Sequence, residues 1–314
     1  MKRQRKVVAA IVVLALGLVA TACGDDDDDT ATADREGPTV QIGAQDFGES
    51  AILAEIYKQA LEADGFQADT QSLGGFRDLL FAAFESGDVN LAPDYLASEL
   101  EFLNEQAGGE PGVATSDAAE TFDLLTPFLE DNDPALVAFE PSDAVNTNAF
   151  VMTQEKADEL GIETLSDLAE KGQDLRLGAP QDCEENAFCI PGLQEVYGLD
   201  LTPNFTPLDT GVIPTSLEED AIDVALLFST DGRIADEGWV LLEDDKQMLA
   251  ADNVLPVATQ ELSDAYGADL AALLDSVSAE LTTTDLTDLN KRYDIDKEDA
   301  ADIAADWLSD HNLS

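Results

Sequence analysis

Two cysteines are the first residues in this sequence whose spacing permits chemistry. Cys183 and Cys189 are separated by five residues, a spacing that suits a disulfide closing a small loop in an oxidising compartment. The alternative is a pair of free thiols. A zinc site is not expected here, because structural zinc requires four ligands and this pair has no companions. We therefore predict a structural bridge between the two cysteines.

Other reactive constellations are missing from the sequence. The single histidine, His311, removes Ser-His-Asp and Cys-His catalysis together with histidine-based zinc sites. The segment 294–298 begins like a calcium loop, but Asp299 and Ala305 stand where that loop needs a glycine and a bidentate glutamate. No glycine-rich phosphate-binding motif is present. We predict no catalytic residue, no metal and no cofactor, and we do not expect an enzyme.

The charge of the chain excludes further classes of function. Its 314 residues include 67 acidic and 15 basic side chains, which gives a net charge of −52. Nucleic-acid binding requires basic side chains that release counterions from phosphates, so it is excluded. Electrostatic attachment to anionic lipid head groups is disfavoured for the same reason. Hydrophobic residues make up 45% of the chain, which is enough for a buried core.

The N-terminus indicates export. Four basic residues within the first six precede an apolar run of 14 residues, 7–20, and a membrane-spanning helix needs about 20. The run therefore reads as the core of a signal peptide. With Cys23 after small residues, residues 1–22 resemble a bacterial lipoprotein signal, cleaved before a cysteine that then carries lipid on the outer face of the cell membrane. A plain secretory signal is the alternative. Residues 23–37, with five consecutive aspartates, are predicted to form an extended acidic tether.

The remaining chain alternates strand-like and helix-like segments. In a first series these are residues 39–43, 49–64, 66–73, 77–85 and 89–92. In a second series they are residues 149–152, 154–160, 175–179, 191–197, 204–208, 221–227, 231–237 and 240–242. A strand at 254–259 and helical sequence to the end follow. This repetition predicts an α/β protein with parallel-type sheets. We expect two lobes, residues 38–147 with 252–314, and residues 148–251.

Several segments together resemble one family. They are residues 42–50, 73–75, 87–95, 146–150 and 223–247, and their order along the chain is the family's order. The chain resembles the extracytoplasmic substrate-binding proteins of osmoprotectant ABC importers, which take up glycine betaine, choline and carnitine. The resemblance extends over nearly all of residues 39–310.

The resemblance implies a two-lobe periplasmic-binding-protein fold of type II. Its lobes are joined by two crossing strands, expected near residues 148–153 and 254–259, and they close over ligand in the cleft. Such a protein captures a quaternary-ammonium compatible solute and delivers it to a separate permease and ATPase. We expect a monomer whose membrane contact is the lipid on Cys23.

The chemistry of such a ligand constrains its site. A quaternary ammonium has no N–H, so aromatic faces hold it, at about 0.5 to 2 kcal/mol each when desolvated. By the resemblance, Tyr95 matches a tyrosine of the family's aromatic cage and Phe228 stands where the family often has tyrosine. Gln45 matches an amide used on the ligand carboxylate, whereas Ser142 and Asn148 fall at or near positions that are often tyrosine.

Further residues could complete the cleft. Phe47 and Phe76, each after a predicted strand, could supply replacement rings or belong to the core, and Gly75 precedes Phe76 in a glycine loop. Ser229, Thr230 and Asp231 either cap the following helix or place its N-terminus towards a ligand carboxylate.

Three other functions remain open at this point. Related proteins bind trimethylated amino-acid derivatives such as ergothioneine, and the missing tyrosines would make room for a larger side group. An exported hydrolase would need a base beside a nucleophile, which the sequence does not display. A structural lipoprotein is disfavoured by the matched cleft segments.

Overall fold

The computed structural model describes residues 35–314. The predicted signal peptide (1–22), the lipid-bearing Cys23 and most of the predicted tether lie outside the described residues. Within the described range, none of the helices combines the length and the apolar character that crossing a membrane requires.

A first five-stranded sheet has the order β2-β1-β3-β10-β4. The bounds of its strands are Val40–Ala44 (β1), Ala68–Ser72 (β2), Leu91–Tyr95 (β3), Leu136–Ala138 (β4) and Val254–Thr259 (β10). β1 runs parallel to β2 and β3, whereas β10 is antiparallel to β3 and β4. The prediction of parallel sheets is therefore only partly right, because β10 enters this sheet from the other one and runs against its neighbours.

A second five-stranded sheet has the order β7-β6-β8-β5-β9. The bounds of its strands are Asn148–Met152 (β5), Leu177–Ala179 (β6), Phe205–Pro207 (β7), Val224–Phe228 (β8) and Val240–Leu241 (β9). β6 runs parallel to β7 and β8, and β5 is antiparallel to β8 and β9. Both sheets are thus mixed, with one strand of reversed direction near the connection.

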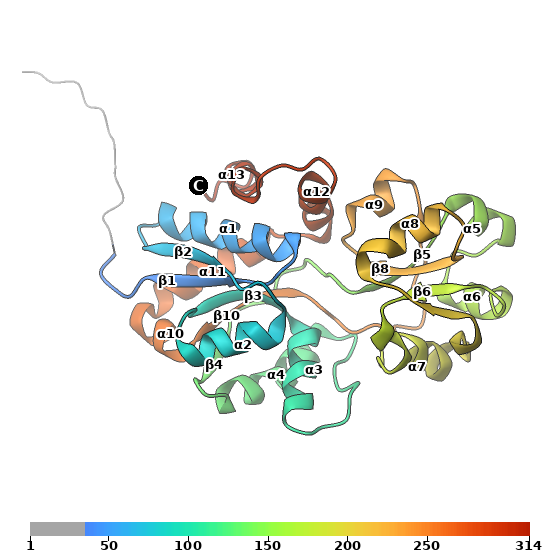
Figure 1. Cartoon of the computed structure of the whole chain (residues 1–314). Helices are drawn as coiled ribbons and strands as arrows, with labels where there is room; N and C mark the ends of the chain where they lie inside the picture. Colours follow the sequence, from blue (N-terminus) through green and yellow to red (C-terminus); the bar gives the residue numbers. More distant parts are fainter. Residues whose placement is uncertain (1–34) are drawn as a thin grey trace, which may run out of the picture. The chain divides into compact units, whose positions relative to one another are not determined.

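Helices cover both faces of the first sheet (Figure 1). Their bounds are Gly48–Ala63 (α1), Arg77–Ser86 (α2), Leu96–Gln106 (α3), Ala118–Asp131 (α4), Gln260–Tyr266 (α10), Ala268–Glu280 (α11), Thr283–Asp294 (α12) and Ala300–Asp310 (α13). Side chains of α1 and α10–α13 form one apolar core with the sheet, and those of α2, α3 and α4 form another. The first sheet therefore lies between two buried layers.

Shorter helices surround the second sheet. Their bounds are Gln154–Leu160 (α5), Leu165–Lys171 (α6), Ile190–Gly192 (α7), Ile213–Glu218 (α8) and Gly232–Asp236 (α9). Where we predicted one helix over 191–197, α7 continues as a π-helical turn, Leu193–Tyr197. Short 3-10 turns occupy Gln181–Glu184, Thr202–Asn204 and Thr210–Val212.

Alternation along the strands divides the apolar side chains between two cores. In β5, Phe150 and Met152 join one buried cluster, while Ala149 and Val151 join the other. Successive side chains of a strand point to opposite faces, so a strand that is apolar throughout must be covered on both sides. The continuous apolar runs that predicted strands near 149 and 221 have this origin.

Two connecting segments pass between the sheets side by side. Val145 and Asn253 form an antiparallel bridge, and the amide of Asn146 donates to the Asp252 carbonyl at 3.0 Å. The stretches predicted to cross, 148–153 and 254–259, are instead mainly the strands β5 and β10. The crossing itself comes just before each of them.

Helices α9 and α12 bring the two sides together at a second point. A Cβ atom on Gly232 would lie only 2.7 Å from the backbone Cα of Lys291. Since real Cβ atoms do not approach a backbone so closely, this contact requires glycine at position 232.

Candidate ligand-binding cleft

A cavity of about 510 Å³ is lined from both sides of the molecule. Arg77, Ser98 and Asp252 contribute from the first sheet's side, and Asn148, Phe188 and Phe228 contribute from the second. Its size suits a small organic molecule. Another hollow of about 710 Å³ is lined by residues of the first side alone. Of these two hollows, the smaller one joins the two sides.

Asn148 and Phe228 lie together at the rim of the second sheet. They are register partners in the antiparallel pair β5–β8. The first four residues of β8 are buried, but Phe228 at its end is 55% exposed. The strand pattern thus places an exposed aromatic ring at the cavity wall, beside Asn148.

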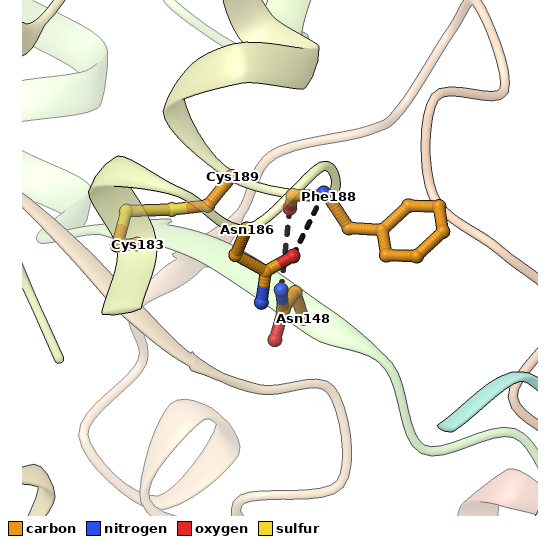
Figure 2. Close-up of a disulfide and its surroundings, with 5 residues drawn as sticks. All are labelled: Asn148, Cys183, Asn186, Phe188 and Cys189. Carbon is orange, nitrogen blue, oxygen red and sulfur yellow. Dashed lines mark hydrogen bonds between the residues drawn. A yellow bond between two sulfur atoms is a disulfide. The ribbon is translucent and has the colours of Figure 1, made fainter. Parts of the chain in front are cut away.

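A disulfide joins Cys183 to Cys189, with Cα atoms 5.2 Å apart (Figure 2). Within this loop the Asn186 side chain accepts a hydrogen bond from the Phe188 amide at 2.8 Å. The side-chain amide of Asn148 donates to the Phe188 carbonyl at 3.2 Å. Figure 2 shows the Phe188 ring pointing away from the disulfide. The bridge and two amide side chains therefore fix the backbone of this loop beside β5.

Phe188 is a cavity residue that sequence reasoning missed. Its ring lines the cavity and also packs against the apolar core of α2, α3 and α4 on the first side. The sequence does show an aromatic residue inside a short cysteine-closed loop that follows a predicted strand. It does not show where this loop lies relative to the first sheet.

Three aromatic rings form a row on the first side. The Phe47 ring lies 6.1 Å from that of Tyr95 and 6.5 Å from that of Phe76, measured between centroids. Tyr95 is buried, Phe47 is half-buried and Phe76 is 63% exposed, so the row runs from the core to the surface. None of these three rings is among the side chains that line the cavity.

Gln45 and Gly75 lie close to this row. The Gly75 carbonyl accepts from the Asp46 amide at 2.9 Å, which ties the glycine loop to the end of β1. Gln45 is buried, and its side-chain Nε2 has no hydrogen-bond partner among the described residues. A buried donor without an acceptor is costly, so Gln45 is a suitable donor for an incoming acceptor.

Ser229, Thr230 and Asp231 bind protein groups in this structure. Asp231 caps α9 by accepting from the Arg233 amide at 3.0 Å, which is the capping role considered above. Ser229 accepts from the amide of Thr147 at 3.0 Å in the crossing segment. Thr230 donates its hydroxyl to Glu49 at 2.7 Å, from the second side to the first.

Charged side chains form the first side of the cavity wall. The Arg77 guanidinium binds both carboxylate oxygens of Asp94, which is 1% exposed. Asp252 accepts hydrogen bonds from the amide and the hydroxyl of Ser98 at 2.9 and 2.6 Å. Glu99 is also buried, and one of its oxygens lacks a partner within residues 35–314. Three carboxyl groups therefore share one guanidinium.

Burial controls the protonation of this group. It raises the pKa of Asp252 to about 6, against the hydrogen bonds from Ser98. It also raises the pKa of Glu99 well above its ordinary value, with the charge of Asp94 acting in the same direction. Burial alone would lower the pKa of Arg77, but the Asp94 carboxylate reverses this and raises it. The guanidinium therefore stays charged, and burial disfavours the ionised forms of Asp252 and Glu99.

Within residues 35–314, no group of three or more histidine, cysteine, aspartate or glutamate side chains is arranged to hold a metal ion.

Comparisons with known proteins identify the family and the fold. A family profile described as "Substrate binding domain of ABC-type glycine betaine transport system" matches residues 38–310. A "Glycine-betaine-binding protein" of Pseudomonas aeruginosa is 30% identical over 285 residues, 88% of each chain. The "Carnitine transport binding protein OpuCC" of Listeria monocytogenes is 26% identical over 278 residues, 87% of each chain. A solved structure described as "Crystal structure of glycine betaine/carnitine/choline ABC transporter" superposes with a TM-score of 0.75 at 26% identity, covering 87% of this chain and 99% of the other.

Proposed function

The chain belongs to the family of substrate-binding domains of ABC-type glycine betaine transport systems, and we propose that it captures a small quaternary-ammonium solute in the cavity between its two sheets. The observation that carries this proposal is Phe228. A large apolar ring that is 55% exposed and borders a two-sided cavity is a binding surface rather than part of a core.

Ring faces and amides supply complementary interactions in this proposal. Phe228 and Phe188 offer aromatic faces to the methylated cation, at about 0.5 to 2 kcal/mol each. Micromolar affinity requires about 8 kcal/mol, so polar contacts must hold the other end of the solute. Asn148 and Asn146, which also line the cavity, are suitable donors.

The ring row of the first side is part of the proposed site. Phe47, Phe76 and Tyr95 would approach the ligand when the two sides close, and Gln45 and Gly75 would line the entrance from β1 and β2. Asn148 would then offer a side-chain amide at or near a position where the family often has tyrosine. The lobes in this proposal are residues 38–147 with 252–314, and residues 148–251.

The proposed place of action is the outer face of the cell membrane. After cleavage of residues 1–22, lipid on Cys23 would anchor the protein, and residues 23–37 would serve as a tether. It would deliver its ligand as a monomer to a permease subunit coupled to a separate ATPase. The family's transport role and the odd number of cysteines in the sequence support this arrangement.

Calorimetric titration tests the ligand class. The mature protein should bind at least one of glycine betaine, choline, carnitine and proline betaine with micromolar or tighter affinity. Binding of ergothioneine alone would favour the larger trimethylated amino acids instead. Absence of binding to all five compounds would contradict the proposed function.

Substitution of the rings tests the site. Phe228→Ala and Tyr95→Ala should each weaken binding at least about tenfold, the equivalent of about 1.4 kcal/mol. Leu124→Ala is a matched control, since Leu124 is an apolar side chain of α4 that is 42% exposed and lies outside the cavity wall. Equal affinities for all three variants and the wild type would remove the proposed aromatic contacts.

A further inference from the structure

Glu49 is a buried acid at the first turn of α1. Its side chain is 5% exposed. One carboxylate oxygen accepts from the hydroxyl of Tyr95 at 2.6 Å and from the side-chain amide of Asn146 at 2.7 Å. The other accepts from the hydroxyl of Thr230 at 2.7 Å and from the side-chain amide of Asn290 at 2.5 Å. Four separate segments, three on or beside the first sheet and one from the second, therefore converge on this single carboxylate.

All four partners of Glu49 are neutral donors. A carboxylate accepts about four hydrogen bonds, so this set saturates it, and a protonated carboxyl would lose one of them. Within residues 35–314, no lysine, arginine or histidine forms an ion pair with Glu49. Two other buried acids do form ion pairs: Asp94 is paired with Arg77, and Asp223 with Arg176 and Lys156.

A buried charge without an opposite charge is energetically unusual. Charges removed from water are normally paired, because their desolvation costs several kcal/mol in a protein interior. Hydrogen bonds offset part of this cost at Glu49, as does the N-terminus of α1, which favours negative charge. The arrangement nevertheless leaves a net negative charge in the interior.

The position of Glu49 relates this charge to the cavity. Asn146 lines the cavity and places its amide group on the carboxylate. Tyr95 begins the row of rings on the first side, and its hydroxyl donates to the same oxygen. Thr230 follows the cavity residue Phe228 by two positions. Glu49 therefore lies one side chain behind the cavity wall at Asn146, and its other partners connect it to the ring row and to the segment that follows Phe228.

We propose that Glu49 is the countercharge for the ammonium group of the ligand, a positioning residue that acts through Tyr95 and Asn146. A cation in the cleft would be attracted by the carboxylate behind the ring and the amide, without direct contact. Tyr95 would remain a neutral phenol in this role, because burial and the adjacent carboxylate raise its pKa well above the ordinary value. The inference rests on the proposed function, since it assumes a cationic ligand.

The charge can be separated from the hydrogen bonds with two ligands of equal shape. In 3,3-dimethylbutan-1-ol a carbon atom replaces the nitrogen of choline, so this alcohol is neutral. Glu49→Gln should lower the affinity for choline about tenfold or more, while changing the affinity for the alcohol less than about threefold. An equal loss for both ligands would mean that Glu49 is only a structural support, and unchanged choline binding would also overturn the inference.

Two control variants isolate the charge. Thr230→Val removes one hydrogen bond to Glu49 but keeps the carboxylate, so the preference for choline over the alcohol should stay within about threefold of the wild type. Glu99→Gln replaces another buried acid, which does not line the cavity and whose pKa burial raises, and it should not alter that preference. A loss of preference in either control equal to that of Glu49→Gln would contradict a specific role for Glu49.

A charge exchange covers the case in which Glu49→Gln does not fold. The double variant Glu49→Gln with Asn290→Asp returns a carboxylate to the same cluster, with donor and acceptor exchanged. It should show a preference for choline close to that of the wild type, and loss of the preference would overturn the inference. If the wild type binds neither choline nor glycine betaine, the proposed function itself has failed. This result is distinct from choline binding that Glu49→Gln leaves unchanged, which overturns only the role of Glu49.

Discussion

The two sides of the cavity are built by different means. On the first side, Arg77 and Asp252 belong to a group of buried charges that includes Asp94 and Glu99. On the second side, the wall contains two rings, Phe228 at the end of β8 and Phe188 in a disulfide-closed loop, beside the amides of Asn148 and Asn186 and the acids Asp182 and Glu185, and it contains no basic side chain among the described residues.

We infer from this difference that the first wall mainly stabilises the fold and that the second wall mainly binds the ligand. The guanidinium of Arg77 is committed to Asp94, so the charges of the first side mainly hold their own elements in place. The exposed Phe228 ring and the half-buried Phe188 ring both line the cavity, and we expect them to provide most of the ligand contact. Substitutions on the first side should therefore mainly change the stability of the fold, and substitutions on the second side should mainly change the affinity for ligand.

The largest expected effect on stability follows from breaking the charged wall. Arg77→Ala leaves three buried carboxyl groups without a cation, and removing one partner of a buried ion pair costs about 3–5 kcal/mol. Denaturant unfolding should show this loss. Arg292→Ala is the control, because its pairs with Glu298 and Asp306 are near the surface and worth about 0–1 kcal/mol. Similar losses in the two variants would contradict the distinction.

A pH profile tests the same wall through Asp252. Burial raises its pKa to about 6, so between about pH 4 and pH 6 the folded protein retains a proton that the unfolded chain has released. The free energy of unfolding of the wild type should therefore fall with rising pH, relative to Asp252→Asn, by at most about 3 kcal/mol. Parallel pH profiles for the two proteins would show that Asp252 titrates normally.

On the second side, removing the disulfide should lower both the stability of the protein and its affinity for the ligand. Replacing Cys183 and Cys189 with serine frees a loop of a few residues, which lowers the stability by about 2 kcal/mol in the chain-entropy description. It also releases Phe188, so affinity for the quaternary ammonium should fall about tenfold. Phe188→Ala with the disulfide intact separates the two effects, because it should weaken binding while keeping the loop closed. Unchanged affinity in both proteins would remove Phe188 from the site.

Part of the fold was predictable because strands such as β8 and β10 are nearly continuous apolar runs. The segments around β1, β5, β8 and β10 and the helix α1 were recognised from periodicity alone, and the two-sheet α/β class is confirmed. Helix α3 was missed because it begins directly after β3 without a capping side chain. Helix α4 contains Pro127, which in a sequence argues against a helix.

The positions of the cavity residues were predictable only in part. The family resemblance singles out Phe228 and Asn148, and both line the cavity because they lie at the end of β8 and the start of β5. Phe188 depends on where its loop packs, and that is a tertiary property. Glu49 resembles any acid in the first turn of a helix, and only the folded structure brings four distant donors to it.

A crystal structure of the protein with choline or glycine betaine would show directly where the solute binds. We expect the methylated nitrogen to lie in the cavity against the rings of Phe228 and Phe188, with no lysine or arginine nitrogen in contact with it. A ligand bound in another hollow, or held in this cavity by charged side chains without ring contacts, would rule out the proposed binding site.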